Sequence, residues 1–343
     1  MSEAPAGFAA DWRAMVAALP PARAAELARR AQAAPLYAHA YAFHLNLRHG
    51  MTPEAVLAFA ARHGLRGVKI HVEDGEGLSL RARDAAGRRA FGARAAALGL
   101  DVHVETSHTA AAELTEAVEI ARAIGATSVR CYPRHAGRVS AVLRQVVADL
   151  GLLARLDPGG QLSFTLEQHE DLRSAELVEV LKRVGNPRLH LLFDFGNMVN
   201  ALETPMTALA VQGPWVTEAH VKDALALPDR GGWAHRACLT GQGHLPMRAL
   251  LVGLLLLGED RPQVTAFALE EEEDYAAPAF RFPGEGPDPV IPPRGASETP
   301  LTGPLEPRLA RERAAADRQV SEVRRMLAEI AAAAAAAAIP APR

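Results

Sequence analysis

The sequence alternates eight short runs rich in β-branched and other apolar residues with longer segments of helical pattern, from about Tyr37 onward. The eight runs span residues 37–45, 67–74, 100–107, 127–134, 161–168, 188–195, 215–223 and 263–271. Strands that alternate with helices build a parallel sheet, and eight such units favour a closed barrel. No G-x-G-x-x-G motif follows the first run, as it would in a dinucleotide-binding open sheet. We therefore predict an α/β fold, a (β/α)8 TIM barrel.

Polar and apolar residues alternate within three of the runs. The apolar residues of the second run are Val68, Ile70 and Val72, and the third and fifth runs repeat the pattern. One parity of a barrel strand faces the helices and the other faces the interior, so the apolar set should face the helices. The interior positions are then Lys69, His71, Glu73, Asp101, His103, Glu105, Ser163, Thr165 and Glu167. Because structural barrels fill their interior with apolar side chains, these positions predict a wet, functional mouth.

The segments that flank the strand runs suggest how the chain is organised. Residues 1–36 predict an N-terminal helical extension, with a helix restarting at Pro20 and Pro21. Residues 37–339 would form the barrel, and residues 308–339, with their helical composition, would supply its eighth helix. Residues 277–306 are rich in proline and glycine, so we expect a long loop or a disordered segment there, most simply a flexible insertion.

Composition excludes several classes of function. The formal net charge is -3 and the pI is about 6.5, so the chain lacks the broad basic character of nucleic-acid and anionic-membrane binders. The longest apolar run, near residues 249–257, is too short to cross a membrane, and the first residues do not resemble a secretory signal. The only cysteines, Cys131 and Cys238, are far apart, which favours a reducing compartment. We predict a cytoplasmic protein.

Four successive runs end in a residue that binds hard metal ions, on the parity that faces the interior. These residues are Glu167, Asp194, His220 and Glu270. The carboxyl ends of all barrel strands meet at one face, so the four side chains should converge there. Three carboxylates and one imidazole suit Mn²⁺, Mg²⁺ or Co²⁺ better than Zn²⁺. The sequence therefore predicts a divalent metal site.

Several motifs around these residues resemble the xylose-isomerase-like TIM-barrel superfamily, which includes ketose 3-epimerases, hydroxypyruvate isomerase, inosose dehydratase and endonuclease IV. The motifs are TLEQHE (165–170), LLFDFGN (191–197), EAHVKD (218–223), LTGQGHLP (239–246) and FALEEEED (267–274). The resemblance implies that the four residues are the metal ligands and that Lys222 and Asp223 complete the end of the seventh strand. Glu272 competes with Glu270 as the last ligand because it has the same parity.

The sequence departs from the superfamily pattern at two places. Asn197 stands where many members have a histidine, so substrate contacts there should differ. A Gly-Gln-Gly sequence at residues 241–243 replaces the common Gly-Glu-Gly and removes one negative charge near the mouth. The endonuclease branch is disfavoured, because the acidic chain does not suit a DNA partner.

Candidate substrate contacts surround the predicted metal site. They are His71, Glu105, Arg130, Arg134, Asn197 and Lys222. Arginine matches a carboxylate or phosphate, so Arg130 and Arg134 point to an acidic substrate. The alternative interpretation is that Arg130 and Lys69 lie deep in the barrel and pair with Glu73, Asp101 or Glu105.

The predicted chemistry is carried by a metal-stabilised enediolate of a small keto-sugar or sugar acid. In an isomerase or epimerase, the resemblance makes Glu167 and Glu270 the catalytic pair that removes and returns a proton. The same site would serve a lyase, either a 3-oxo sugar-acid decarboxylase or an inosose-type dehydratase. A non-catalytic sugar-binding barrel is the third alternative, although it would not need three convergent carboxylates. The expected partner is a small sugar or sugar acid, and the sequence leaves the oligomeric state, a homo-oligomer included, open.

Overall fold

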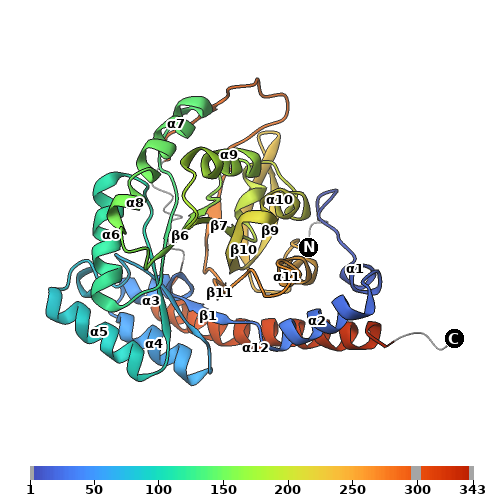
Figure 1. Ribbon diagram of the computed structural model, residues 1–343, viewed down its shortest axis with the longest axis horizontal. Coiled ribbons are helices and arrows are strands. Elements are labelled where there is room, and N and C mark those ends of the chain that lie inside the picture. The colour runs from blue at the N-terminus through green and yellow to red at the C-terminus, as the bar shows by residue number, and fades with distance from the viewer. Residues whose placement is uncertain (1–3, 295–302, 340–343) are drawn as a thin grey trace.

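Eight parallel strands form a closed barrel in a computed structural model that describes residues 4–294 and 303–339 (Figure 1). The strands follow the order β1, β2, β3, β4, β6, β7, β8, β11, and β11 pairs with β1 to close the ring. Their bounds are β1 Leu36–His39, β2 Gly67–His71, β3 Asp101–Glu105, β4 Ser128–Cys131, β6 Ser163–Glu167, β7 Leu189–Asp194, β8 Val216–Val221 and β11 Ala266–Leu269. Each strand overlaps one predicted run. The predicted (β/α)8 TIM barrel is confirmed.

Helices surround the barrel and connect its strands. The α-helices are α1 Trp12–Ala17, α2 Pro21–Gln32, α3 His44–Arg48, α4 Pro53–Arg62, α5 Ala85–Ala97, α6 Ala111–Ile124, α7 Val139–Leu150, α8 Leu153–Leu156, α9 Ser174–Val184, α10 Pro205–Gln212, α11 Met247–Leu255 and α12 Leu305–Ala337. Short 3-10 helices are η1 Ala40–Phe43, η2 Glu76–Leu78, η3 Asn197–Val199 and η4 Gly213–Trp215. The apolar strand parity packs under these helices in one continuous core.

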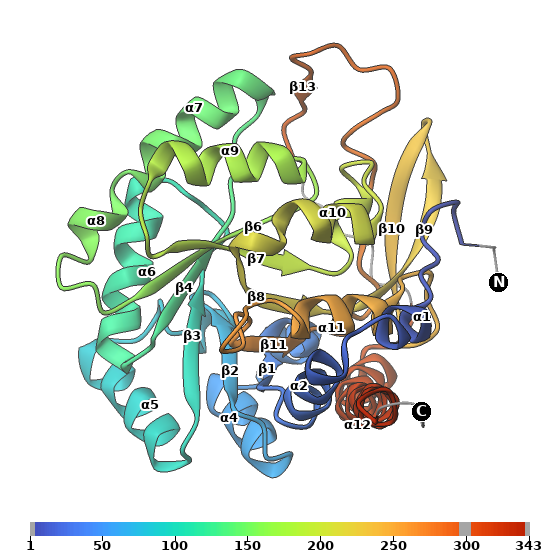
Figure 2. The ribbon, with the colours of Figure 1, turned by 45° about the vertical axis from the view of Figure 1, so that its right-hand side comes forward.

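The two ends of the chain pack together on the outside of the barrel. The long helix α12 lies against α2, as both ribbon views show (Figures 1 and 2). Arg30 on α2 is buried and donates hydrogen bonds to the backbone carbonyls of Leu255, Leu257, Gly258 and Glu259, just after α11. These bonds satisfy carbonyl groups that a helix end leaves without partners. The N-terminal helices therefore hold α11 as well as α12.

The lower interior of the barrel is a network of buried charges. Lys69 is 0% exposed and pairs with Glu218, which also accepts a hydrogen bond from Ser128. The nitrogen Nδ1 of His103 lies 3.4 Å from the same carboxylate. Buried charges are stable in such pairs. The prediction that all interior polar positions form a wet mouth is therefore wrong for this layer, and Lys69 belongs to the barrel interior rather than to the pocket.

Two small sheets lie at the carboxyl ends of the barrel strands. In one, β10 Gly232–Cys238 pairs with β9 Asp223–Asp229 and β12 Ala276–Ala277. In the other, β13 Val290–Ile291 pairs with β5 Gly137–Arg138. The sequence analysis did not predict the β9–β10 hairpin.

Two other segments differ from the predictions. The first predicted run, residues 37–45, is a strand only to His39, because Nδ1 of His39 accepts the Tyr41 backbone N–H and starts the helix η1. Of the described parts of the Pro/Gly-rich segment, residues 277–294 pack on the barrel, with Phe280, Arg281 and Ile291 buried, and residues 305–306 begin α12. The interpretation as a flexible insertion is wrong for those parts, and residues 295–302 lie outside the described residues.

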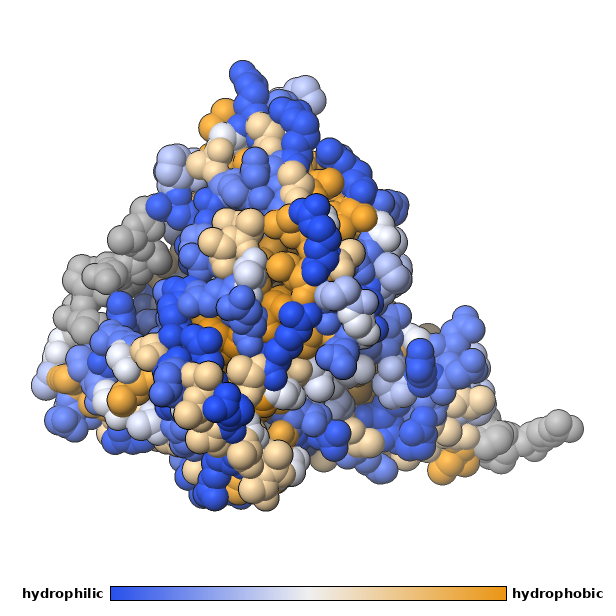
Figure 3. All heavy atoms as spheres, turned by 60° about the vertical axis from the view of Figure 1, so that its left-hand side comes forward, coloured by the Kyte–Doolittle hydropathy of each residue, from blue (hydrophilic) through white to orange (hydrophobic). Residues whose placement is uncertain are grey.

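One face of the molecule carries both hydrophilic and hydrophobic side chains, as expected for a chain with 49% hydrophobic and 22% charged residues. Figure 3 shows a face on which hydrophilic side chains predominate and hydrophobic ones gather near the middle. Among the helices of the described residues, none combines the length and the apolar character needed to cross a membrane.

Candidate active site

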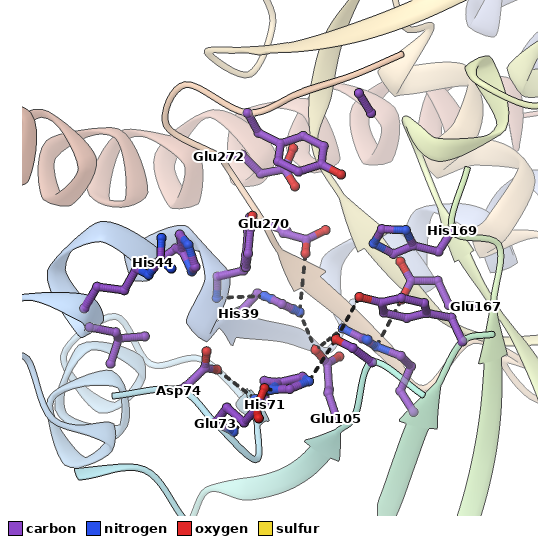
Figure 4. A pocket seen from close by; sticks show the side chains of 18 of the residues that line it. His39, His44, His71, Glu73, Asp74, Glu105, Glu167, His169, Glu270 and Glu272 are labelled. Carbon is purple, nitrogen blue, oxygen red and sulfur yellow. Dashed lines mark hydrogen bonds and ion pairs between the residues drawn. The ribbon is translucent and has the colours of Figure 1, made fainter. Parts of the chain in front are cut away.

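A cavity of about 1200 Å³ opens at the carboxyl ends of the barrel strands. Its floor includes residues at the ends of four barrel strands, β1, β3, β6 and β11: His39, Glu105, Glu167 and Glu270 (Figure 4). The described part of the Pro/Gly-rich segment supplies a wall through Phe280. The cavity therefore lies at the face of the barrel where side chains from different strands meet.

The four predicted metal ligands converge at the base of this cavity, which Glu167 and Glu270 line directly. Nδ1 of His220 lies 3.5 Å from Oε1 of Glu167, 3.6 Å from Oδ2 of Asp194 and 3.2 Å from Oε2 of Glu270. All four residues are at most 5% exposed. The residues were predicted from four separate motifs, and the barrel places them around one imidazole nitrogen. We call these four residues the carboxylate–histidine cluster.

The cluster fits a hard divalent cation. Each member has a buried polar atom without a hydrogen-bond partner among the described residues: Oε2 of Glu167, Oδ2 of Asp194, Nδ1 of His220 and Oε2 of Glu270. Burying such atoms without hydrogen bonds is costly, and a cation between them would lower that cost. Two groups of three, Glu167–Asp194–His220 and His39–His220–Glu270, each present donor atoms within 4.8 Å of one another. The donor set of oxygens and an imidazole suits Mg²⁺ or Mn²⁺ and also admits Zn²⁺.

Glu105 orients the imidazole of His220 from the opposite side. Nε2 of His220 donates to Oε1 of Glu105 over 3.0 Å, if the ring carries its proton there. This arrangement leaves the lone pair of Nδ1 facing the carboxylates, as in histidine ligands held by an outer carboxylate. Although burial opposes protonation, Glu270, Glu167 and Glu105 raise the pKa of His220 well above its usual value. The cluster therefore has a strongly negative field that favours a cation.

His39 is a residue of this site that the sequence analysis missed. It ends β1, and its Nε2 lies 2.8 Å from Oε2 of Glu105 and 3.6 Å from Oε1 of Glu270. Figure 4 shows it between these two carboxylates. A signal was present in the sequence, because Tyr37, His39 and Tyr41 alternate with alanines on one parity, as the polar residues do in the second and third strands.

Lys222 lies at the rim of the cluster. Its Nζ is 3.1 Å from Oδ2 of Asp194, 3.3 Å from Oε2 of Glu270 and 3.1 Å from Oε1 of Glu272. Burial opposes the charge, but these carboxylates raise the pKa of Lys222 well above its usual value. Burial raises the pKa of Glu272 to about 8 despite Lys222 beside it. Glu272 follows the end of β11 and contacts Lys222 rather than His220, so Glu270 is better placed as the fourth ligand.

Arg130 and Asn197 hold the cluster from outside. Arg130 is 6% exposed, and its guanidinium lies 2.5 Å from Oε2 of Glu105 and 3.0 Å from Oε2 of Glu167. The alternative in which Arg130 pairs with Glu105 is therefore what the structure contains. Asn197 is 1% exposed and donates to Oε1 of Glu167 over 3.1 Å. Its side chain holds a cluster residue and is not among those that line the cavity, and a contact of Asn197 with substrate stays a prediction.

The remaining predicted substrate contacts, His71 and Arg134, lie on the wall formed after β2, β3 and β4. Nε2 of His71 is 3.0 Å from Oγ of Ser107, and burial lowers the pKa of His71 to about 3, so its ring is neutral. Arg134 is exposed and donates to Oη of Tyr132 over 2.7 Å. Both side chains line the cavity and are available to a bound molecule.

The conformation of the Gly-Gln-Gly segment depends on Asp223, the residue after Lys222. The carboxylate of Asp223 accepts the backbone N–H groups of Gly241 and Gly243, each over 2.9 Å. A Cβ at Gly243 would lie 2.1 Å from Oδ1 of Asp223, and Gly241 has a φ of +87°. Glycine is required at 243 because the loop approaches the carboxylate too closely for a side chain, and it is favoured at 241 by the positive φ. Asp223 therefore anchors a loop and does not face the cavity.

Comparison with known proteins identifies the family. The profile of the xylose isomerase-like TIM barrel family matches residues 57–264, and the chain belongs to this family. The Escherichia coli protein YihM, described as uncharacterized, is 48% identical over 310 residues, which cover 90% of this chain and 95% of that protein. A 3-oxo-isoapionate decarboxylase from Pectobacterium atrosepticum is 27% identical over 165 residues, 46% of this chain and 58% of that enzyme.

Solved structures share the fold at low sequence identity. An IOLI protein with a bound zinc atom superposes with a TM-score of 0.57 at 13% identity, over 87% of this chain and 98% of that one. A Mycobacterium smegmatis xylose isomerase-like TIM barrel protein in complex with magnesium superposes with a TM-score of 0.53 at 15% sequence identity. The match covers 85% of this chain and 99% of that one. A Methylomonas D-allulose 3-epimerase in complex with D-allulose superposes with a TM-score of 0.53 at 17% sequence identity. The match covers 69% of this chain and 84% of that one. These likenesses show the fold alone.

Proposed function

We propose that this protein is a divalent-metal-dependent enzyme that acts on a small keto-sugar or sugar acid as an isomerase or epimerase. The observation that carries the proposal is the carboxylate–histidine cluster, in which four buried side chains each present a ligand atom that makes no hydrogen bond among the described residues. A protein that only binds a sugar has no need for three convergent carboxylates, because their repulsion costs stability. Glu167, Asp194, His220 and Glu270 would hold the ion.

When bound, a divalent ion would polarise the substrate carbonyl and so lower the pKa of the neighbouring C–H group. The chain itself supplies the groups that move the proton. Glu167 and Glu270 come from β6 and β11, which are separated in the barrel by β7 and β8, and they reach His220 from different sides. One carboxylate would remove the proton from the substrate carbon, and the other would return a proton to the opposite face.

The two proposed catalytic residues are held in place by different partners. Asn197 and Arg130 contact Glu167, whereas Lys222 and His39 contact Glu270. Fixed partners keep a catalytic group in its reactive geometry and reduce the reorganisation that the reaction needs. The cations beside Glu270 outweigh its burial and lower its pKa, which keeps it ionised as a base requires.

A decarboxylase of 3-oxo sugar acids is the second candidate. Two observations favour it: the partial sequence likeness to a 3-oxo-isoapionate decarboxylase, and an exposed arginine, Arg134, on the cavity wall. Loss of CO₂ from a 3-oxo acid leaves the same enediolate that proton removal from a keto-sugar gives. The two reactions therefore differ in which bond of the substrate is placed for cleavage.

The deciding experiment offers metal-loaded protein a panel of keto-sugars and 3-oxo sugar acids in D₂O and follows the products by NMR. An isomerase or epimerase gives an isomeric product with deuterium at the reacting carbon, whereas release of CO₂ identifies the decarboxylase. Glu167→Gln and Glu270→Gln should each lower the rate by at least about a hundredfold, given the usual contribution of a proton-transfer group. The matched control is Glu179→Gln, an exposed glutamate on α9. Full activity of both cluster variants would contradict the proposal.

A further inference from the structure

One arginine on the cavity wall differs from the others in its partners. Five arginines line the cavity: Arg48, Arg81, Arg130, Arg134 and Arg294. Four of them have a carboxylate within 4 Å, for example Glu170 and Asp171 beside Arg294. Within the described residues, Arg134 has no such carboxylate, and its hydrogen bond goes to the hydroxyl of Tyr132. Among the residues that the structure describes, no ion pair therefore neutralises the positive charge of Arg134.

The wall presents the Arg134 guanidinium in a defined position. Tyr132 follows the end of β4, is buried, and stacks on His169 with 3.9 Å between ring centres. The hydroxyl of Tyr132 donates to Oγ of Ser107 over 2.7 Å and accepts from Arg134. The guanidinium carbon of Arg134 lies 5.0 Å from the centre of the Tyr132 ring, in cation–π range. Because arginine has five N–H donors and this bond uses one, donors remain for a ligand.

The position of Arg134 relative to the carboxylate–histidine cluster sets the length of the molecule that could reach both. Arg130 contacts Glu167 of the cluster, and its guanidinium carbon lies 5.1 Å from the centre of the same Tyr132 ring. Because both guanidinium carbons lie within 5.1 Å of one ring centre, the two arginines are at most about 10 Å apart, and this bounds the length of a molecule that reaches both. His71 on this wall is held neutral by burial, so it adds no positive charge beside Arg134.

We propose that Arg134, presented by Tyr132, binds an oxyanion group at the end of the substrate that is remote from the carboxylate–histidine cluster. This inference deepens the proposed function and rests on it for the position of the reacting carbon. The substrate class is then an anionic sugar derivative, with a carboxylate or a phosphate at that end. Guanidinium groups bind both oxyanions through paired, charge-assisted hydrogen bonds.

The test measures binding of three keto probes by isothermal titration calorimetry: D-fructose, D-fructose 6-phosphate and 5-keto-D-gluconate. The full-length, metal-loaded wild type is compared with Arg134→Met, which keeps much of the apolar stem, and with Arg134→Lys. The control is Arg144→Met, an exposed arginine on α7 outside the cavity. Inorganic phosphate is titrated separately into chelator-treated protein, where binding does not depend on a metal ion. A failure of the metal assignment is therefore distinguishable from a failure of the Arg134 subsite.

We expect at least one anionic probe to bind wild type and Arg144→Met about tenfold or more tightly than D-fructose. Arg134→Met should reduce that preference to about twofold or less, with D-fructose affinity unchanged, and Arg134→Lys should keep part of it. The probe that is preferred distinguishes a carboxylate from a phosphate. The proposal is overturned if wild type does not prefer either anionic probe, if the preference survives in Arg134→Met, or if wild type binds neither anionic probe nor phosphate.

Discussion

Replacing Arg130 by methionine removes a guanidinium that contacts two buried carboxylates. The side chain of Arg130 is 7% exposed, and those of Glu105 and Glu167 are 0% and 2% exposed. Methionine keeps much of the apolar stem but cannot donate a hydrogen bond, so both glutamates lose a charged partner. The substitution therefore tests whether Arg130 is a structural part of the cluster.

The expected loss in the free energy of unfolding depends on the charged contacts that Glu105 keeps without Arg130. Removing one partner of a buried pair usually costs about 3–5 kcal/mol. Glu105 still has Nε2 of His39 at 2.8 Å, Nε2 of His220 at 3.0 Å and Nζ of Lys69 at 3.6 Å. These contacts keep its charge compensated, so we expect the lower end, about 3 kcal/mol of the free energy of unfolding.

The assay is urea denaturation of chelator-treated protein, which removes any stabilisation by bound metal. Arg134→Met is the matched control, because Arg134 has no carboxylate partner among the described residues, and it should change the free energy of unfolding by less than about 0.5 kcal/mol. Adding Glu105→Gln to Arg130→Met should cost less than the sum of the two single changes, since the pair is coupled. A loss below about 1 kcal/mol in Arg130→Met, or strict additivity with Glu105→Gln, would refute this account of the arginine.

Three further predictions concern the loop, the pH response and the ion. Gly243→Ala should lower the free energy of unfolding by about 1–3 kcal/mol in urea titration, because the new Cβ would lie 2.1 Å from Oδ1 of Asp223. An unchanged free energy of unfolding would mean that the loop moves freely. Burial lowers the pKa of His235, which is hydrogen-bonded to Asn200, to about 4. As pH falls from about 6.5 to about 4, His235 takes up a proton in the unfolded chain but not in the folded chain, so roughly 2–3 kcal/mol of the free energy of unfolding is lost. In His235→Gln the free energy of unfolding should fall less steeply with pH. An unchanged dependence on pH would exclude His235 as its source. Adding Mn²⁺ or Mg²⁺ to chelated protein should raise the melting temperature, and no shift with either would count against a metal site.

Much of the fold could be predicted from the sequence, because burial imposes a regular pattern on each barrel strand. The alternation of β-rich runs with helical segments located eight strands. Val68, Ile70 and Val72 face the helices and had to be apolar, and such patterns in three runs gave the parity of the polar residues. The ends of the strands were less predictable. The first run continues in apolar residues past His39, but a local hydrogen bond from the Tyr41 backbone turns the chain into a helix.

The residues of the candidate site were predictable where the strand parity and the motifs agreed, as for Asp194 and His220. The contact of Asn197 was not predictable. Its position shortly after Asp194 suggested that it faces the cavity, whereas its side chain donates a hydrogen bond to Glu167. Whether Arg130 is free or paired depends on which carboxylate a neighbouring strand places opposite it. That depends on the register of β3 and β4, which sets Glu105 beside Arg130. Single-strand patterns do not contain this information.

The metal content of purified variants tests the central claim most directly. Wild type should bind about one divalent ion per chain, and Asp194→Ala and His220→Ala should bind none, since each opens the cluster. Glu272→Gln is the discriminating variant, because Glu272 has the parity of a ligand but contacts Lys222 instead of His220. We predict that elemental analysis finds about one ion per chain in Glu272→Gln, as in wild type. Equal metal content in wild type, Asp194→Ala and His220→Ala would contradict the account.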